Sequence, residues 1–168
     1  MSTQIQNIDD TEQRLEGRAL TFLIEDQYYA IEIIHVIEII EMQVITVVPQ
    51  IPSYMRGIIN LRGKIIPVMD VRIRFGKPEK EYNDRTSIIV IEIKGVSIGL
   101  IVDMVDEVLQ IEEHNLAATP KFNNINTNKF IRALGKVHDE VKLLIDCDKL
   151  LDDVSGLYQT QPIEDFEV

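Results

Sequence analysis

The chain has 168 residues, of which 45% are apolar, and this fits one globular domain or two small lobes that share a core. Its 28 acidic and 17 basic side chains give a formal net charge of −11, which argues against a protein that binds nucleic acid through the phosphate backbone. A single cysteine excludes an internal disulfide and a metal site built only from cysteines.

Neither end of the chain carries a targeting signal. The first ten residues, MSTQIQNIDD, lack the basic start and apolar core of a secretory signal. No apolar run approaches the roughly 20 residues that span a bilayer. We therefore expect a cytoplasmic protein with no direct insertion into a membrane. Residues 1–17 and 153–168 are expected to be flexible polar tails, the second of them acidic.

The apolar residues are those of a β protein. There are 27 isoleucines and 15 valines, a quarter of the chain. Branching at the β-carbon stiffens these side chains and favours the pleated strand over the helix. The composition therefore predicts a mainly β fold.

Strand-like runs separated by turn residues follow along the chain. Alternation over 20–24 and the run 28–33 predict two strands that are joined by a turn at Asp26-Gln27. Three more hairpins are predicted: 58–61 with 64–69, 88–93 with 96–100, and 130–137 with 141–145. Gly63 and Gly95 would supply positive φ at two of the turns. Pro67 lacks an amide hydrogen, so its strand should lie at an edge or be bulged there.

Two segments have mixed patterns. Residues 31–41 and 100–111 space their apolar residues as a helix does, yet the first is dominated by isoleucine and valine. We interpret both as strands with bulges or short helical turns. A short C-terminal helix is predicted over 148–152, with Asp146 as its N-cap.

No catalytic constellation can be assembled from the sequence. Cys147 lies between two aspartates, whose negative charge disfavours the thiolate. Asp103, Asp106 and Glu107 can be written as an acid–base or metal set, but we favour a solvated strand edge, in which they alternate with valines. We therefore expect no enzyme activity, no metal and no cofactor. A small acidic metal-dependent enzyme is the alternative from a different class.

Charge is unevenly distributed along the chain. Residues 56–77 carry a net charge of +5, whereas 25–41 and 103–113 carry −5 each. Such a surface can orient protein partners through complementary fields, and the basic segment can equally pair with acids of the same chain. A barrel that binds single-stranded nucleic acid through residues 56–77 is disfavoured, because the bases lack interleaved aromatic residues.

The segment 56–72, RGIINLRGKIIPVMDVR, resembles the signature of CheW-type domains, the coupling proteins of bacterial chemotaxis. Flanking segments also resemble the family: 29–33, 36–39, 99–108, 130–135 and 143–146. The resemblance covers residues 18–152. It implies two packed five-stranded SH3-like β-barrels that share a core, with short helical turns.

The resemblance also implies a function. A CheW-type protein is a non-enzymatic scaffold that links the cytoplasmic hairpin tip of chemoreceptors to the histidine kinase CheA, at arrays beneath the membrane. This sequence carries no kinase region and no receiver domain like that of CheV proteins, so it resembles the stand-alone coupler. An adaptor of another sensory array fits the same motifs.

The resemblance assigns roles to particular residues. Those matched to receptor binding, in a groove between the two barrels, are Arg62, Ile33, Val36, Gly57 and Val108. Those matched to kinase binding are Glu38, Ile39 and, as the anchor of a second array contact, Phe122. Gly63 and Gly95 are expected to be structural turn residues. Ala117 departs from the arginine that is sometimes found before the Phe122 loop.

Overall fold

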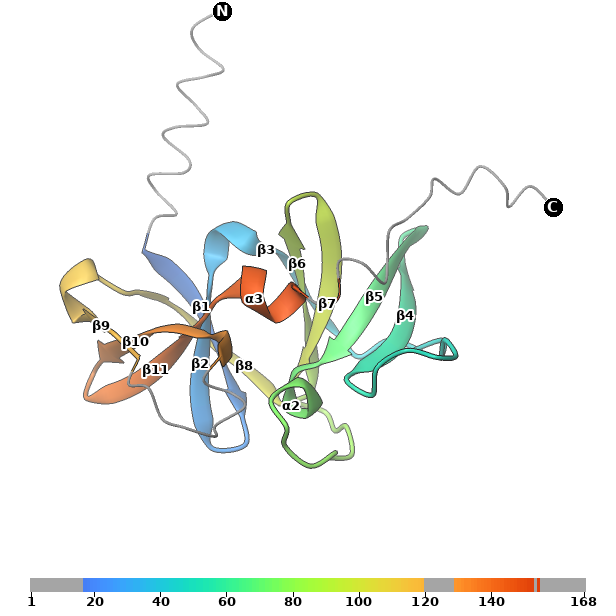
Figure 1. Ribbon diagram of the computed structural model, residues 1–168, viewed down its shortest axis with the longest axis horizontal. Coiled ribbons are helices and arrows are strands. Elements are labelled where there is room, and N and C mark those ends of the chain that lie inside the picture. The colour runs from blue at the N-terminus through green and yellow to red at the C-terminus, as the bar shows by residue number, and fades with distance from the viewer. Residues whose placement is uncertain (1–16, 120–128, 153, 155–168) are drawn as a thin grey trace, which may run out of the picture.

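The computed structural model describes residues 17–119, 129–152 and Val154. Across these residues the chain folds into eleven strands in two sheets, with short helical turns (Figure 1). The expected tails and Phe122 lie outside the described residues, apart from Gly17 and Val154. None of the helices within the described part is long and apolar enough to cross a membrane.

The first sheet, which we call lobe 1, has the strand order β8-β1-β2-β11-β10-β9. Its strands are β1 (Arg18–Ile24), β2 (Gln27–Glu32), β8 (Met104–Gln110), β9 (Leu116–Ala117), β10 (Ile131–Val137) and β11 (Glu140–Ile145). All neighbours are antiparallel except β2 and β11. The two-residue strand β9 adds a sixth strand to the five that were expected.

The second sheet, lobe 2, has the order β3-β6-β7-β5-β4. Its strands are β3 (Val36–Glu41), β4 (Met55–Leu61), β5 (Lys64–Asp70), β6 (Ser87–Ile93) and β7 (Val96–Val102). Beyond β3, Thr46 pairs with Ile58 of β4 through two backbone hydrogen bonds of 2.9 Å, which curls the sheet back on itself. The strand that contains Pro67 is internal, but its pairing with β7 begins only at Val68, so no hydrogen bond to β7 is lost.

The structure resolves both mixed segments as strands. Residues 31–41 contain the end of β2, the 3₁₀ turn η1 (Ile33–His35) and β3. Residues 100–111 run from β7 into β8 with a break at Asp103, where the chain leaves lobe 2 and enters lobe 1. The predicted C-terminal helix is α3 (Cys147–Leu151), capped by Asp146, whose carboxylate accepts the Lys149 amide at 3.2 Å.

Two further short elements join strands. Asp70 caps α2 (Val71–Arg74) after β5, and η2 (Glu113–Asn115) precedes β9. In the Arg62-Gly63 turn the φ values are 51° and 84°, and in the Lys94-Gly95 turn they are 51° and 80°. Both turns are therefore of the two-residue hairpin type that needs a positive φ at both positions. The first turn of the chain lies one residue earlier than expected, at Glu25-Asp26.

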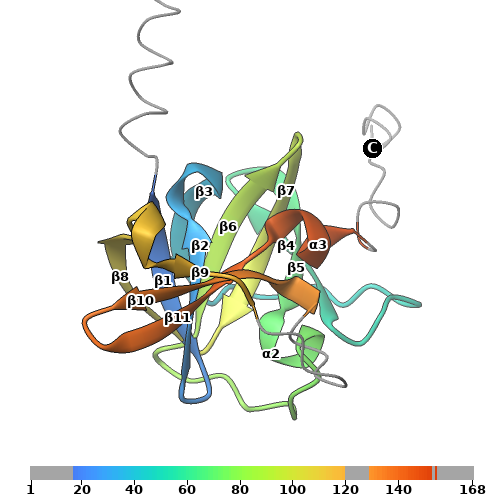
Figure 2. The ribbon, with the colours of Figure 1, turned by 60° about the vertical axis from the view of Figure 1, so that its left-hand side comes forward.

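The two lobes pack on one apolar core. Figures 1 and 2 show the two sheets next to each other, and in Figure 1 α3 lies between them. Aromatic rings run across the junction: Phe22 and Tyr29 come from lobe 1, Phe75 follows α2, and Phe130 precedes β10, with neighbouring ring centroids 5.0–5.9 Å apart. Each lobe also encloses a smaller apolar cluster of its own. The predicted mainly β fold with a shared core is confirmed.

Candidate protein-binding surfaces

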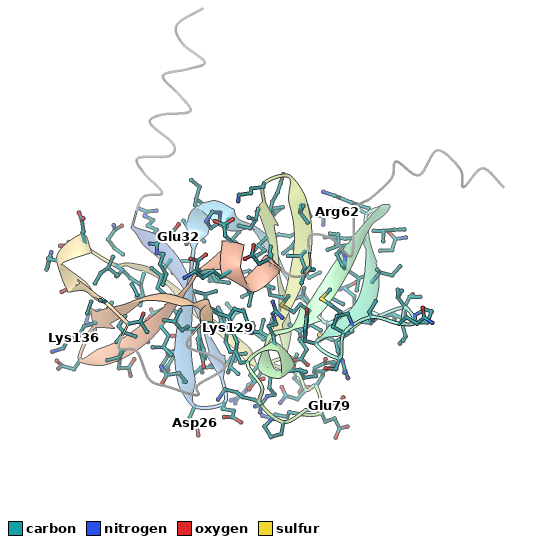
Figure 3. All side chains as sticks on the ribbon, in the orientation of Figure 1. Asp26, Glu32, Arg62, Glu79, Lys129 and Lys136 are labelled. Atoms are coloured by element: carbon teal, nitrogen blue, oxygen red, sulfur yellow. The ribbon has the colours of Figure 1, made fainter. Side chains whose placement is uncertain are left out.

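Arg62 occupies the tip of the β4–β5 hairpin, as the turn residues predict (Figure 3). Its side chain is 71% exposed, and its guanidinium forms an ion pair with Glu38 of β3, which is 24% exposed. Glu38 lies on β3 and Arg62 directly follows β4, the strands at the two edges of the lobe 2 sheet, and the curl of that sheet brings these edges together. The residue matched to receptor binding and a residue matched to kinase binding therefore contact each other.

Three apolar residues border the core between the lobes, and we call them the inter-lobe seam: Ile33, Val36 and Val108. Ile33 and Val36 are half-buried and pack against the shared core. Val108 pairs with Leu20, which is buried in that core, and directly paired residues point to the same face of a sheet. Val108 is nevertheless 51% exposed, because β8 is an edge strand. The seam thus offers apolar surface contributed by both lobes.

The outer side of β3 and η1 carries a row of isoleucines, which we call the β3 outer face: Ile34, Ile37 and Ile39. Each is about half exposed, while Glu38 and Ile40 point away from this face. The resemblance matches Ile39 to kinase binding, and the structure shows that Ile34 and Ile37 are exposed to a similar degree. The sequence pattern did not find them because β3 is apolar on both faces, so that alternation does not tell which isoleucines face solvent.

Gly57 is buried beneath the segment that follows β3. Its φ is 140°, and a Cβ at this position would lie 2.1 Å from the Thr46 carbonyl oxygen and 2.9 Å from the Ile45 side chain. A glycine is required here because the chain passes so closely over β4. Gly57 is therefore placed to act on a binding surface through the backbone around it. Phe122 lies outside the described residues.

Much of the basic segment is paired within the chain. The ion pairs are Arg56–Glu79, Arg62–Glu38, Arg72–Asp103, Arg72–Glu25 and Lys77–Glu25. Lys64 also bonds to the Ser97 hydroxyl at 3.0 Å. Internal pairing, which the sequence left open, therefore uses much of the positive charge of residues 56–77. Arg62 is 71% exposed, the largest exposed fraction among the arginines of these ion pairs, since its side chain projects from a hairpin tip.

Asp103 has a structural role. It accepts hydrogen bonds from the Arg72 guanidinium and from the Glu25 backbone amide. Burial acts to raise the pKa of Asp103, but these hydrogen bonds and the Arg72 charge outweigh burial and hold the pKa below its usual value. Among the residues that the structure describes, no group of three metal-ligating side chains comes together.

Cys147 begins α3 and is buried against the shared core. Burial, reinforced by the nearby charge of Glu32, raises the pKa of its thiol to about 12. We expect native Cys147 to react at pH 8 with a thiol reagent such as DTNB about a hundredfold or more slowly than in the protein unfolded by urea, because the thiolate is the reactive form. Time courses of absorbance with and without urea measure this ratio, and equal rates would contradict the burial.

Comparisons with known proteins agree with this architecture. The family model for the CheW-like domain matches residues 18–155. The chain is 33% identical to the chemotaxis protein CheW of Bacillus subtilis over 139 residues, 83% of this chain and 89% of that protein. It is 34% identical to the chemotaxis protein CheW of Thermotoga maritima over 142 residues, 83% of this chain and 91% of that protein.

A solved structure gives the same result. The scaffolding protein TtCheW from Thermoanaerobacter tengcongensis matches with a TM-score of 0.72 at 36% identity, over 77% of this chain and 88% of that chain. The match to the family model extends across both lobes and includes the hairpin that carries Arg62. The chain belongs to the CheW-like domain family, a family of adaptor and scaffold proteins of chemotaxis.

Proposed function

We propose that this protein is a non-enzymatic scaffold that couples chemoreceptors to the histidine kinase CheA. The main support for the proposal is that strand β3 contributes residues both to the inter-lobe seam and to the β3 outer face. The Arg62–Glu38 ion pair also joins β3 to the tip of the β4–β5 hairpin. A scaffold that holds two partners together needs binding surfaces that are distinct and adjacent. The names of its relatives, chemotaxis protein CheW and a scaffolding protein, support the same role.

On the receptor side, the helical hairpin tip of a chemoreceptor docks along the inter-lobe seam, with Arg62 and the backbone around Gly57 completing the surface. Helices bind by laying an apolar face on apolar surface, which Ile33, Val36 and Val108 provide. An arginine at the periphery supplies a fork of donors for carboxylates and favours the correct orientation.

On the kinase side, CheA docks on the β3 outer face. Exposed apolar side chains gathered on one strand and its preceding turn are typical of a protein-binding surface. Ile39 belongs to this face, whereas Glu38, the other residue matched to kinase binding, points to the opposite side of β3 and pairs with Arg62. Binding both partners would recruit this protein from the cytoplasm to membrane-associated receptor arrays, where Phe122 supplies a second array contact.

Reconstitution tests the proposal. The purified protein is mixed with CheA and a receptor cytoplasmic fragment, and CheA autophosphorylation is measured with each component omitted in turn. We expect kinase activity to depend on the receptor fragment only when this protein is present. Kinase activity that is indifferent to the protein, or a failure to bind both partners at micromolar concentration, would refute it.

The Arg62 assignment has its own test. Arg62→Glu removes the guanidinium and places a carboxylate beside Glu38, so we expect receptor-fragment binding to weaken at least about tenfold. Binding of CheA should change by less than about threefold, because the β3 isoleucines stay in place. Isothermal titration calorimetry with each partner measures both affinities.

Lys94→Glu is the matched control for Arg62→Glu. Lys94 precedes a glycine at the tip of the β6–β7 hairpin, has the same φ of 51° and is also largely exposed. Its reversal changes the net charge equally, so it should leave both affinities near those of the unaltered protein. If Arg62→Glu weakened both partners equally, Arg62 would be a structural residue and the assignment would be wrong.

A further inference from the structure

Arg72 is the centre of a partly buried ionic cluster, which we call the Arg72 clasp: Glu25, Arg72, Lys77 and Asp103. The Arg72 side chain is only 9% exposed. Its Nη2 and Nε bond to the two Asp103 carboxylate oxygens at 2.7 and 3.3 Å, and its Nη1 bonds to Glu25 Oε1 at 3.0 Å. Lys77 Nζ holds the other Glu25 oxygen at 3.0 Å.

The clasp spans the junction between the lobes. Arg72 lies on α2 in lobe 2, whereas Glu25 lies in the β1–β2 turn of lobe 1. Asp103 is the single residue between β7 and β8, where the chain crosses from one lobe to the other. Its amide donates to the Leu23 carbonyl at 3.1 Å, and its carboxylate accepts the Glu25 amide at 2.8 Å. One guanidinium therefore fixes the crossing point and the opposing turn together.

The clasp and the seam lie at opposite ends of the molecule. Asp26, in the same turn as Glu25, is at the lower end of Figure 3, whereas Glu32, next to Ile33 of the seam, is at the upper end. Elsewhere lobe 2 meets lobe 1 through the shared apolar core, whose contacts have little directional preference, and through α3, where Arg74 donates to the Leu150 carbonyl at 3.0 Å and Lys94 pairs with the exposed Asp148. A rotation of one lobe on that core, with the clasp released, would move Val108 relative to Ile33 and Val36.

We propose that Arg72 is a positioning residue for receptor binding: through Glu25 and Asp103 it fixes the angle between the lobes and thereby sets the inter-lobe seam. The proposal rests on the proposed function for its binding consequence. A planar guanidinium bonded to two carboxylates is suited to this task, because its N–H donors point in fixed directions and so restrict where the two acceptors can lie. The β3 outer face lies on one side of the junction, so its shape does not depend on the clasp.

The first test uses the protein alone. Spin labels are attached to Glu92→Cys in lobe 2 and Lys136→Cys in lobe 1, two exposed positions, in a Cys147→Ala background. Pulsed electron spin resonance then gives the distribution of distances between the lobes. We expect Arg72→Gln to broaden or shift this distribution and Arg72→Lys to restore part of it. The matched control is Arg56→Gln, since Arg56 pairs with Glu79 within lobe 2, and it should leave the distribution unchanged.

The second test measures binding. We expect Arg72→Gln to weaken receptor-fragment binding about tenfold and CheA binding by less than about threefold, with partial recovery in Arg72→Lys. Glu25→Gln provides a milder variant if Arg72→Gln does not fold. It leaves the Arg72–Asp103 pair intact, so that neither of these two partly buried charges loses its partner. It should produce the same selective loss, smaller in size.

The outcomes separate the two proposals. Unchanged distance distributions in the folded variants, or equal losses for receptor and kinase, would overturn the positioning role. If the unaltered protein bound no receptor fragment, the proposed function would fail, while the distance distributions would still decide whether the clasp sets the angle between the lobes.

Discussion

Replacing Gly57 by alanine is expected to lower the free energy of unfolding by about 3 kcal/mol, a large loss for one methyl group. The added Cβ would meet the Thr46 carbonyl oxygen at 2.1 Å, and the φ of 140° already strains any side chain. The segment around Thr46 must move away, which breaks the two hydrogen bonds that it makes with Ile58. Urea denaturation with an unchanged m-value measures the loss.

Gly63→Ala is the control for Gly57→Ala. Gly63 also has positive φ, 84°, but a Cβ there would meet nothing within 4 Å. Only the backbone strain of the left-handed region remains, about 1–2 kcal/mol. If the two variants lost the same free energy of unfolding, the contact with Thr46 would not determine the cost of Gly57→Ala. The need for glycine at position 57 would then come from its positive φ alone.

The hairpins were predictable because the residues that determine them lie next to one another in the sequence. Arg62-Gly63 and Lys94-Gly95 lie between strand-like runs, and the turn they form depends only on the φ values those residues adopt. Asp146 as the N-cap of a helix is equally local, since its carboxylate bonds to an amide three residues on. The same reasoning misplaced the first turn by one residue, because Asp26 is a turn residue but does not show whether it takes the first or the second position of the turn.

The contacts between distant segments were beyond the sequence pattern. Nothing in the spacing of charges indicates that Arg72 reaches Glu25 and Asp103, which are 47 and 31 positions away. From the sequence, Asp103 is best interpreted as part of a solvated strand edge, whereas the structure pairs its carboxylate with Arg72. The break at Asp103, where the chain passes from β7 of lobe 2 to β8 of lobe 1, likewise depends on pairing between strands that are distant in the sequence.

The candidate site was predicted in part. The hairpin tip of Arg62 follows from its turn, whereas its roles and those of Val36 and Ile39 came from resemblance. Side-chain exposure divides these residues: Val36 packs on the shared core and Ile39 is open to solvent, although both lie on one strand. A strand that is apolar on both faces contains no periodicity from which that division can be read. Whether these residues bind receptor and kinase stays a prediction.

Phe75→Ala is expected to destabilise the whole molecule by about 3–5 kcal/mol, because it removes a buried ring where both lobes meet. Phe75 is 2% exposed, and its ring centroid lies 5.0 Å from that of Tyr29 and 5.7 Å from that of Phe130. Since the lobes share one core, they should unfold together in one transition. Urea titrations followed by tyrosine fluorescence and by Cys147 reactivity should therefore give the same midpoint.

Ile65→Ala is the control for this loss. Ile65 lies on β5 and is 50% exposed, so its truncation leaves no cavity in the core and should cost well under about 1 kcal/mol. A comparable loss in both variants would mean that Phe75 contributes no more than an exposed apolar residue. Separate midpoints for the two probes in Phe75→Ala would mean that each lobe is stable by itself, in which case the shared core would not couple them.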